Sequence, residues 1–516
     1  MVTSIKSAAL SGIDSFIVSV EVDVSSGLPC MEMIGLLGTE VKEAKERVRV
    51  SLKNNGISIP PVRITVNLSP ADVKKDGTHY DLPIAISLLT GLGIIKSGGA
   101  DDIIFAGELG LNGELKRIHG VLPMALEARK KGIKTFILPK ENALEGAVVQ
   151  GIDVIGVDSL SEVIQYVNGS EEERRDLFEI TTVNIEEIFE NERFNYRFDY
   201  SEMCGQDSVK RAMLIAAAGF HNVLMIGSPG SGKTMAAKRL PTIMPPLTFA
   251  ESMDVSKIYS VCGLLNNREN IISRRPFMSP HHTVSDVAMA GGGRVPRPGI
   301  ISRSHKGVLF LDEAVHFSRA CLEILRQPLE DKEIQVARTS GTFTFPAEFM
   351  LVAAINPCPC GNFPDKKLCT CSEQTIRRYL EKISGPILDR IDICVEAPKI
   401  SLPELGGGHS DIDSKSMRER VLSAIEMQKE RFKGNSSLIF NSQMGPGDIE
   451  KYIILGDKEK KLMEDIFSKM NLSARGYHRM LKVARTIADV DQSESIECKH
   501  IMEAACYRSI EDKYWK

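Results

Sequence analysis

The sequence has no run that approaches ~18 consecutive apolar residues, the length at which a segment becomes a candidate membrane-spanning helix. Its N-terminus has no basic segment followed by an apolar stretch, which is the pattern of an export signal. We find neither an internal repeat nor a low-complexity tract. We therefore expect a cytoplasmic protein with no membrane contact.

The sequence also lacks a large excess of charge of either sign: it has 64 basic and 68 acidic residues, and its net charge is −4. A uniformly basic surface for nucleic acid is thereby excluded, so any such contact has to come from a local patch. Eleven cysteines would be unusual as a disulfide framework in a large cytoplasmic protein. We interpret scattered cysteines as reduced core residues and clustered ones as metal ligands.

Apolar residues make up 43% of the 516-residue chain and charged residues 26%, which is typical of a soluble protein with enough material for cores. At ~100 to 200 residues per domain, this length predicts about three domains. Short strands alternate with helical patterns over residues 1–166, which indicates an α+β domain. In this domain Asn112-Gly113 predicts a two-residue hairpin turn, since both turn positions need positive φ.

A charged and polar stretch follows, and we interpret residues 167–191 as a linker. Residues 192–400 carry three apolar strands, Asn222–Ile226, Gly307–Leu311 and Phe349–Ile355, separated by helical or irregular stretches. This order favours a mostly parallel sheet.

A second linker is expected over residues 401–416, where glycine and aspartate are frequent. Helical periodicity then covers 417–516, with the clearest patterns in Met417–Arg431, Lys458–Lys469 and Ala474–Asp489. The sequence predicts a helical C-terminal domain.

A complete phosphate-loop pattern follows the first of the three strands and precedes a helix. Glycines let successive backbone N–H groups face phosphate oxygens, a lysine bridges the outer phosphates, and a hydroxyl binds Mg²⁺. The pattern consists of Gly227, Ser228, Pro229, Gly230, Ser231, Gly232, Lys233 and Thr234. We predict that it binds ATP with Mg²⁺, and that Thr234 is a ligand of the metal.

Two carboxylates end the next strand, at Asp312 and Glu313. We predict that Asp312 lies on the Mg²⁺ side of the nucleotide and that Glu313 polarises the attacking water. The third strand ends at Asn356, whose side-chain amide is placed to orient that water near the γ-phosphate. A plain turn into Pro357 is the alternative for Asn356, and the other two motifs favour the catalytic role.

Two arginines are candidates for sensing or stabilising the terminal phosphate. Arg390 follows a predicted helix on a loop that could face a neighbouring subunit, and Arg475 opens a helix of the C-terminal domain. From spacing alone, surface arginines without such a role are commoner.

Four cysteines gather in one short segment: Cys358, Cys360, Cys369 and Cys371. Four thiolates suffice to close a tetrahedral zinc site, so we predict a structural Zn²⁺, with reduced cysteines in an ordinary loop as the alternative.

Basic residues dominate between Ile271 and Lys306, where only one acid, Asp286, occurs. Within this segment the candidate DNA contacts are Arg294, Arg297 and Arg303. A loop of this kind in the channel of a ring would track a DNA backbone with little sequence preference. Subunit contacts, or contacts to a neighbour's nucleotide, are the alternative.

The assembled motifs resemble the YifB/ComM family of magnesium-chelatase-like AAA+ ATPases over nearly the whole chain. Further matching stretches are Gly27–Pro29, Val66–Asp72, Ser279–Thr283, Gly291–Gly293, Arg326–Glu330 and Asn356–Gly361. The resemblance implies a P-loop NTPase core, a C-terminal helical lid and a homo-hexamer with active sites between subunits. It also implies that Arg390 is an arginine finger and Arg475 a second sensor.

The N-terminal region is similar to the Lon-type protease domain, a fold of the ribosomal S5 domain 2 kind, through Lys75–Pro83 and Gly107–Gly113. Proteases of this type need a serine where His79 stands and a lysine near Pro123, so we predict no proteolysis.

ComM-like members of the family are helicases that promote branch migration of incoming DNA. The resemblance thus favours an ATP-driven motor on single-stranded or branched DNA. A magnesium-chelatase motor subunit and a chaperone-like protein remodeller are the alternatives, and the N-terminal domain favours the first reading, since a chelatase motor would normally need no such domain.

Overall fold

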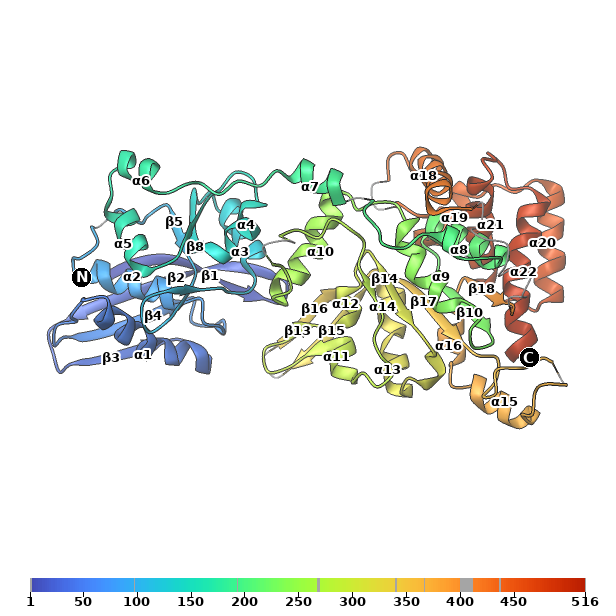
Figure 1. Cartoon of the computed structure of the whole chain (residues 1–516), viewed down its shortest axis with the longest axis horizontal. Helices are drawn as coiled ribbons and strands as arrows, with labels where there is room; N and C mark the ends of the chain where they lie inside the picture. The colour runs from blue at the N-terminus through green and yellow to red at the C-terminus, as the bar shows by residue number, and fades with distance from the viewer. Residues whose placement is uncertain are drawn as a thin grey trace.

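The structure is a computed structural model that describes residues 2–96, 98–192, 194–266, 270–338, 341–365, 367–399, 412–435 and 438–515. The molecule is elongated, with an N-terminal unit at one end, a parallel-sheet unit in the middle and helices of the C-terminal region at the other end (Figure 1). The chain is therefore a multidomain α/β protein.

The N-terminal unit is built on a mixed seven-stranded sheet of order β3-β4-β2-β1-β5-β8-β9. Its strands are β1 (Val2–Ser11), β2 (Asp14–Ser25), β3 (Cys30–Ile34), β4 (Arg63–Ser69), β5 (Ile103–Phe105), β8 (Thr135–Pro139) and β9 (Asp153–Val157). Its helices are α1 (Thr39–Asn54), α2 (Asp81–Gly91), α3 (Val121–Lys130), η1 (Lys140–Asn142), α4 (Ala143–Ala147) and α5 (Leu160–Asn168).

Strand alternation builds the core of this unit. Val18, Val20 and Val22 point to one face of β2 and are fully buried with residues of α1 and α2, such as Val48 and Leu88. The other side of the sheet packs against α3 and α4 through a second cluster that contains Phe136. Apolar residues at a spacing of two thus place helices on both faces.

The predicted hairpin is present, but its loop differs from the prediction. Strands β6 (Glu108–Leu109) and β7 (Leu115–Lys116) pair antiparallel, and the N–H of Gly113 donates to the carbonyl of Gly110 at 3.0 Å. Gly113 has φ 89°, whereas Asn112 is not among the residues with positive φ. The connection is a three-residue turn followed by a left-handed glycine, since Gly113 alone supplies the positive φ.

The range 167–191, for which we expected a linker, contains regular structure. Helix α6 (Glu171–Leu177) begins with a capping box between Ser170 and Glu173, and α7 (Ile185–Glu192) follows. Phe178 packs edge-on against Tyr166 of α5, with ring centroids 5.2 Å apart. The first part of this range therefore packs onto the N-terminal unit.

The central unit contains a five-stranded sheet of order β11-β14-β17-β10-β18, in which all strands are parallel. Its strands are β11 (Phe277–Met278), β14 (Val308–Leu311), β17 (Met350–Ile355), β10 (Val223–Gly227) and β18 (Ile393–Ala397). The helices before β14 are η2 (Tyr200–Glu202), α8 (Asp207–Gly219), α9 (Lys233–Arg239), η3 (Leu240–Thr242), α10 (Phe249–Val261), α11 (Asp286–Ala290) and α12 (Ile300–Arg303). Those after β14 are η4 (Ala314–His316), α13 (Arg319–Ile324), α14 (Arg326–Asp331), α15 (Glu373–Leu380) and α16 (Gly385–Leu388).

The three predicted strands of this unit are confirmed as β10, β14 and β17, and the predicted parallel sheet is confirmed with them. Strands β10, β14 and β17 are buried along their whole length, as expected for a sheet covered on both faces. Two small ribbons extend from the unit: β12 (Gly291–Gly292) with β13 (Arg297–Pro298), and β15 (Glu333–Arg338) with β16 (Gly341–Pro346).

Helices fill the C-terminal region, as predicted: α18 (Ser414–Arg431), η5 (Asn441–Gln443), α19 (Pro446–Tyr452), α20 (Asp457–Lys469), α21 (Ala474–Val490) and α22 (Cys498–Trp515). Residues of α18, α21 and α22 belong to the same hydrophobic cluster as α8 and one face of the parallel sheet. These helices are therefore packed onto the nucleotide-binding unit. Most of the expected second linker, residues 401–411, lies outside the described residues.

A buried charge cluster ties the C-terminal helices together. The carboxylate of Asp489 on α21 is fully buried and forms ion pairs with Arg431 of α18 and Arg485 of α21. Asn441 also donates to it, at 2.8 Å. The ion pairs and the hydrogen bond to this carboxylate offset the free-energy cost of removing its charge from water.

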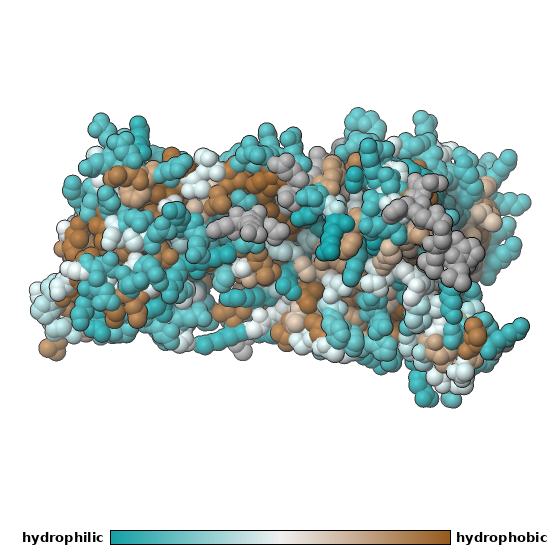
Figure 2. All heavy atoms as spheres, viewed as in Figure 1, coloured by the Kyte–Doolittle hydropathy of each residue, from teal (hydrophilic) through white to brown (hydrophobic). Residues whose placement is uncertain are grey.

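The face drawn in Figure 2 is mainly hydrophilic, with separate apolar areas. Among the residues that the structure describes, no helix is long and apolar enough to cross a membrane.

Asp489→Ala is expected to destabilise the C-terminal helices by ~3–5 kcal/mol, because it leaves two buried guanidinium groups without their anion. Urea unfolding followed by circular dichroism measures this change. The matched control is Lys429→Ala, which removes an exposed pair with Glu426 and should cost less than ~1 kcal/mol. Equal losses of unfolding free energy in the two variants would contradict the stabilising role of Asp489.

Candidate nucleotide site

The phosphate loop joins the end of β10 to the start of α9. Gly230 has φ 77° and Gly232 has φ 84°, which is a conformation that other L-residues rarely adopt. A Cβ atom at Gly227 would lie 2.4 Å from the carbonyl oxygen of Ala397 on β18. Glycine is therefore required both for the turn of the loop and for its close packing on the neighbouring strand.

Lys233 is the first residue of α9, and its side chain folds back over the loop. Its Nζ donates to the carbonyl oxygens of Gly227 at 2.7 Å and Ser228 at 2.9 Å. Burial lowers the pKa of Lys233, while Asp312 and Glu313 act in the opposite direction. The ammonium group is thus held at the mouth of the loop, where it can bridge the outer phosphates of a nucleotide.

Thr234 and Asp312 meet across the gap between α9 and β14. The hydroxyl of Thr234 donates to Oδ2 of Asp312 at 2.7 Å. A hydroxyl and a carboxylate oxygen this close together can both be ligands of one small cation with oxygen preference, which fits Mg²⁺. The two side chains that the sequence predicted as Mg²⁺ ligands therefore lie next to each other.

Glu313 occupies an unusual backbone position immediately after Asp312. Its φ of 50° is in the left-handed region, and its side chain is exposed. Strain of this kind is found at functional sites, where it aims a side chain. Here Glu313 lines a cavity of about 370 Å³ together with Pro229 to Met235, Asp312 and Asn356.

Asn356 follows the last residue of β17, the strand between β14 and β10. Its Oδ1 accepts from Nζ of Lys233 at 3.3 Å. The cavity therefore joins the three predicted strand-end motifs, the phosphate loop, the paired acids and Asn356.

Arg390 and Arg475 lie outside the residues that line this cavity, and they share one carboxylate. Glu330, the second-last residue of α14, forms ion pairs with both guanidinium groups, with 3.1 Å between its Oε1 and Arg475. Arg390 also donates to the carbonyl of Pro386 at 2.6 Å. The structure thus brings the two arginines together on Glu330, and neither lines the nucleotide cavity of its own chain.

The sequence reasoning missed three residues near these features. Glu330 appeared only as part of a family motif, and no local pattern showed its partners.

The segment before α8 lies behind the phosphate loop. A Cβ at Gly232 would lie 3.5 Å from Met203, and Gln206 donates to the carbonyl of Pro398 at 2.6 Å. The signal for Gln206 is weak, since its left-handed φ of 59° is visible only in the structure.

The three candidate DNA-binding arginines differ in exposure. Arg294 and Arg297 are exposed on and beside the β12–β13 ribbon, whereas Arg303 is half-buried at the end of α12. Arg294 donates to the hydroxyl of Thr39 at 2.8 Å, which links the ribbon to the N-terminal unit. A groove of about 860 Å³ between the two units contains Arg294 and Arg297 as well as acidic residues.

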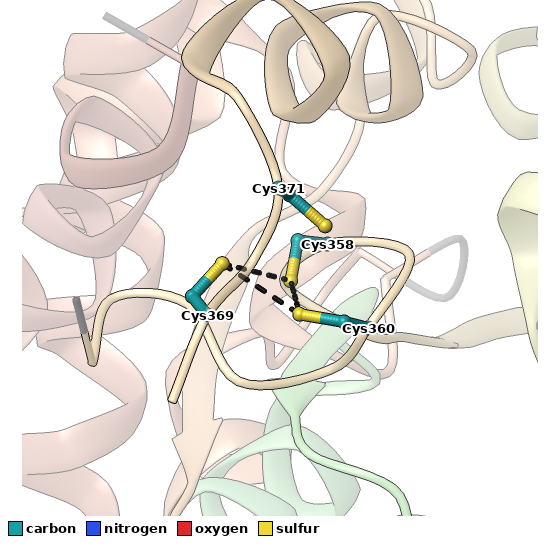
Figure 3. Close-up of side chains that lie close together, drawn as sticks. All are labelled: Cys358, Cys360, Cys369 and Cys371. Atoms are coloured by element: carbon teal, nitrogen blue, oxygen red, sulfur yellow. Dashed lines mark hydrogen bonds between the residues drawn. The ribbon is translucent and has the colours of Figure 1, made fainter. Parts of the chain in front are cut away.

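The four clustered cysteines converge on one point (Figure 3). The Sγ atom of Cys358 lies 3.3 Å from that of Cys360 and 3.8 Å from that of Cys369. All four sulfur atoms lie within 4.8 Å of one another. The loop that carries them continues directly from Asn356.

His79 is buried in the N-terminal unit, at the position where the resemblance would require a serine. One ring nitrogen lies 2.9 Å from the carbonyl oxygen of Ala8, and burial lowers the pKa of His79 to about 4. Pro123 is buried in α3. Neither residue can act as the nucleophile or base of a serine-lysine protease.

Three family models match the chain. Residues 20–142 match "Subunit ChlI of Mg-chelatase", residues 199–405 match "Magnesium chelatase, subunit ChlI", and residues 411–508 match its C-terminal model. The second of these ranges contains every residue of the nucleotide cavity.

Relatives align over almost the full length. The chain is 40% identical over 507 residues to competence protein ComM of Haemophilus influenzae, covering 98% of this chain and 97% of that protein. It is 39% identical over 510 residues to the YifB protein of Escherichia coli, covering 98% and 96%. The chain belongs to the YifB/ComM family of magnesium-chelatase-like AAA+ ATPases.

As a YifB/ComM member, the chain is an ATPase of the AAA+ class that uses ATP and Mg²⁺, and the cavity described above has the groups that this chemistry needs. The magnesium-chelatase 38 kDa subunit of Rhodobacter capsulatus is a more distant relative. It is 25% identical over 178 residues, which is 31% of this chain and 50% of that subunit. YifB/ComM proteins therefore share with this chain a full-length organisation that the chelatase subunit matches only in part.

Glu313→Gln is expected to lower kcat for ATP hydrolysis by ~10² to 10⁴-fold, because it removes the carboxylate that we predict to activate the attacking water. Binding of a fluorescent ATP analogue should change little, since the P-loop contacts remain.

Lys233→Ala is the matched comparison, because it should abolish binding itself by removing the cation of the loop. Loss of binding in Glu313→Gln, or its retention in Lys233→Ala, would contradict these roles.

Proposed function

We propose that this protein is a cytoplasmic ATP-driven motor, a hexameric helicase or branch-migration factor that acts on single-stranded or branched DNA. The observation that supports this most directly is the position of Arg390 and Arg475. Both lie on one ion-paired cluster outside the cavity of their own chain. Arginines that do not line their own cavity are placed to stabilise the terminal phosphate of a neighbouring subunit, which favours a ring with shared sites.

The hydrolytic step follows from the residues of the cavity. Glu313 accepts a proton from water as the water oxygen attacks the γ-phosphorus and the bond to the β,γ-bridging oxygen breaks. The amide of Asn356 orients this water, and Lys233 holds the phosphate oxygens. Thr234 and Asp312 would hold Mg²⁺, which would supply positive charge to the phosphates. The products are ADP and inorganic phosphate.

Arg390 acts in this proposal as the finger that enters the neighbouring site. Its side chain is 14% exposed, and its guanidinium is already oriented by Glu330 and by the carbonyl of Pro386. A pre-oriented arginine loses less rotamer freedom when it meets the phosphate. Arg475, 67% exposed on the first turn of α21, reports the nucleotide state to the helical lid, residues 417–516.

DNA is the proposed substrate because the exposed cations lie on a short ribbon. Arg294 lies in the turn between β12 and β13, Arg297 is the first residue of β13, and Val295 between them is exposed. A basic ribbon that faces the channel of a ring can contact successive phosphates without reading bases. The relative from Haemophilus influenzae, which is 40% identical over 98% of this chain, is named a competence protein. That name agrees with a DNA substrate.

The hydrogen bond from Arg294 to Thr39 suggests a role for the N-terminal unit, residues 1–166. It would hold the ribbon in place, or release it when DNA binds, without chemistry of its own.

The second candidate is a motor that moves a protein or a chelatase partner. The family-model matches named for the chelatase subunit favour it, and the ATP site would be the same. The two candidates differ in what stimulates hydrolysis.

ATP hydrolysis is expected to rise several-fold with single-stranded or forked DNA at low salt, and this stimulation should fall steeply between ~50 and 200 mM salt as counterions compete for the phosphates. Arg294→Glu/Arg297→Glu should lose the stimulation but retain basal hydrolysis. Lys429→Glu/Lys433→Glu, at two exposed positions in and just after α18, is the charge-matched control. Hydrolysis that ignores every DNA would favour the protein or chelatase partner.

Mixing inactive chains tests the shared site. Arg390→Ala and Glu313→Gln chains are each expected to be inactive, but an equal mixture should recover about a quarter of wild-type activity, since one interface in four pairs an intact Glu313 with an intact Arg390. If the mixture stays inactive while both chains assemble, Arg390 does not act across the interface.

A further inference from the structure

The four-cysteine loop, residues 358–371, has the geometry of a metal site. Tetrahedral zinc with bonds of ~2.3 Å to four sulfurs requires sulfur atoms ~3.8 Å apart. The distances among Cys358, Cys360 and Cys369 are 3.3, 3.6 and 3.8 Å, and Cys371 is within 4.8 Å of each. A disulfide needs ~2.05 Å, so these pairs are not oxidised bridges. Four free thiols converge as a ligand set would.

Backbone donors surround the sulfur atoms. The N–H of Phe363 points at Cys358 Sγ at 3.4 Å. The N–H groups of Asn362 and Thr370 face the sulfur of Cys360, and the N–H of Cys371 faces that of Cys369. Four thiolates this close together would repel one another unless a cation lies among them.

We propose that Cys358, Cys360, Cys369 and Cys371 bind one structural Zn²⁺, and that this metal fixes the position of Asn356 and of the phosphate loop. All four positions of a tetrahedral ion are filled by protein sulfur, so no position is open for substrate. The metal acts on hydrolysis only through the loop that it closes.

The loop meets the nucleotide site at two points. Cys358 follows Asn356 by two residues, and its side chain is fully buried beneath the end of β17. Gly361 packs against the phosphate loop so closely that a Cβ there would lie 2.5 Å from Cδ of Pro229. With φ 76°, Gly361 also turns the chain back toward the cysteines. Displacement of the loop would therefore move both Asn356 and Pro229.

The opposite side of the loop is attached to the end of the C-terminal helix. Phe363 packs edge-on against Tyr514 of α22, with ring centroids 5.8 Å apart. Trp515 donates to the carbonyl of Leu380 at 3.2 Å, at the end of the helix that follows Cys371. The closed loop thus connects α22 to the phosphate loop, and a metal would give this connection its rigidity.

Metal content tests the site itself. The full chain, purified without added metal or chelator, should contain about one zinc per chain, and Cys369→Ser/Cys371→Ser should contain almost none. Cys506→Ser, an exposed cysteine on α22, is the matched control and should keep its zinc. Replacement by Co²⁺ should give the visible absorption bands of a tetrahedral thiolate complex. Wild-type protein that retains no zinc and yields no such bands would overturn the site.

Kinetics test the coupling, which rests on the proposed ATPase mechanism. In Cys371→Ser, kcat for ATP should fall at least ~10-fold because Asn356 loses its position, and KM should rise because the phosphate loop loses its support at Pro229. Cys371→His, which supplies an imidazole ligand, should restore both zinc and kcat. Full kcat in a folded, zinc-free variant would overturn the coupling.

The two failures can be told apart. A wild-type chain that hydrolyses ATP and responds to DNA but contains no zinc contradicts the metal site and not the proposed function. A wild-type chain that contains zinc but hydrolyses no ATP contradicts the proposed function and not the metal site.

Discussion

The alignment of three adjacent parallel strands is the constraint on which the active site depends. In β14, β17 and β10, Leu311 pairs with Ala353 and Ile226 with Ile355, so the three strands end at one edge. Asp312, Asn356 and the phosphate loop are the residues that immediately follow these ends. Because parallel strands all direct their carboxyl ends to the same side, the register alone gathers side chains that are far apart in sequence.

Packing of the helical C-terminal region extends this constraint to the rest of the chain. Helices α18, α21 and α22 share one hydrophobic core with α8 and a face of the sheet. A shift of the sheet would therefore also move these helices. Glu330 on α14 holds Arg475 of α21 together with Arg390, which follows α16. This carboxylate joins the central unit to the helices at the surface where the two arginines lie.

The loop after β17 shows how local and distant order combine. Its first residue, Asn356, belongs to the nucleotide site, its cysteines converge a few residues later, and Phe363 contacts α22. Ordering a segment without helix or strand costs ~1–2 kcal/mol of conformational free energy per residue. The packing of Phe363 on Tyr514 offsets part of this cost, and a metal bound by the four thiols would offset more.

The sequence by itself determined those features that depend on neighbours along the chain. The phosphate loop, the acid pair at the end of an apolar strand, the three strands and the C-terminal helices each follow from local pattern and spacing. Tertiary structure decided the rest. It alone places Glu330 between Arg390 and Arg475, Gly361 against Pro229, and Arg294 on Thr39, and it gives the 110–114 turn its single left-handed residue. These contacts join residues that are far apart in the sequence, and their spacing follows neither helix nor strand periodicity. Only the packing of the folded chain could therefore determine them.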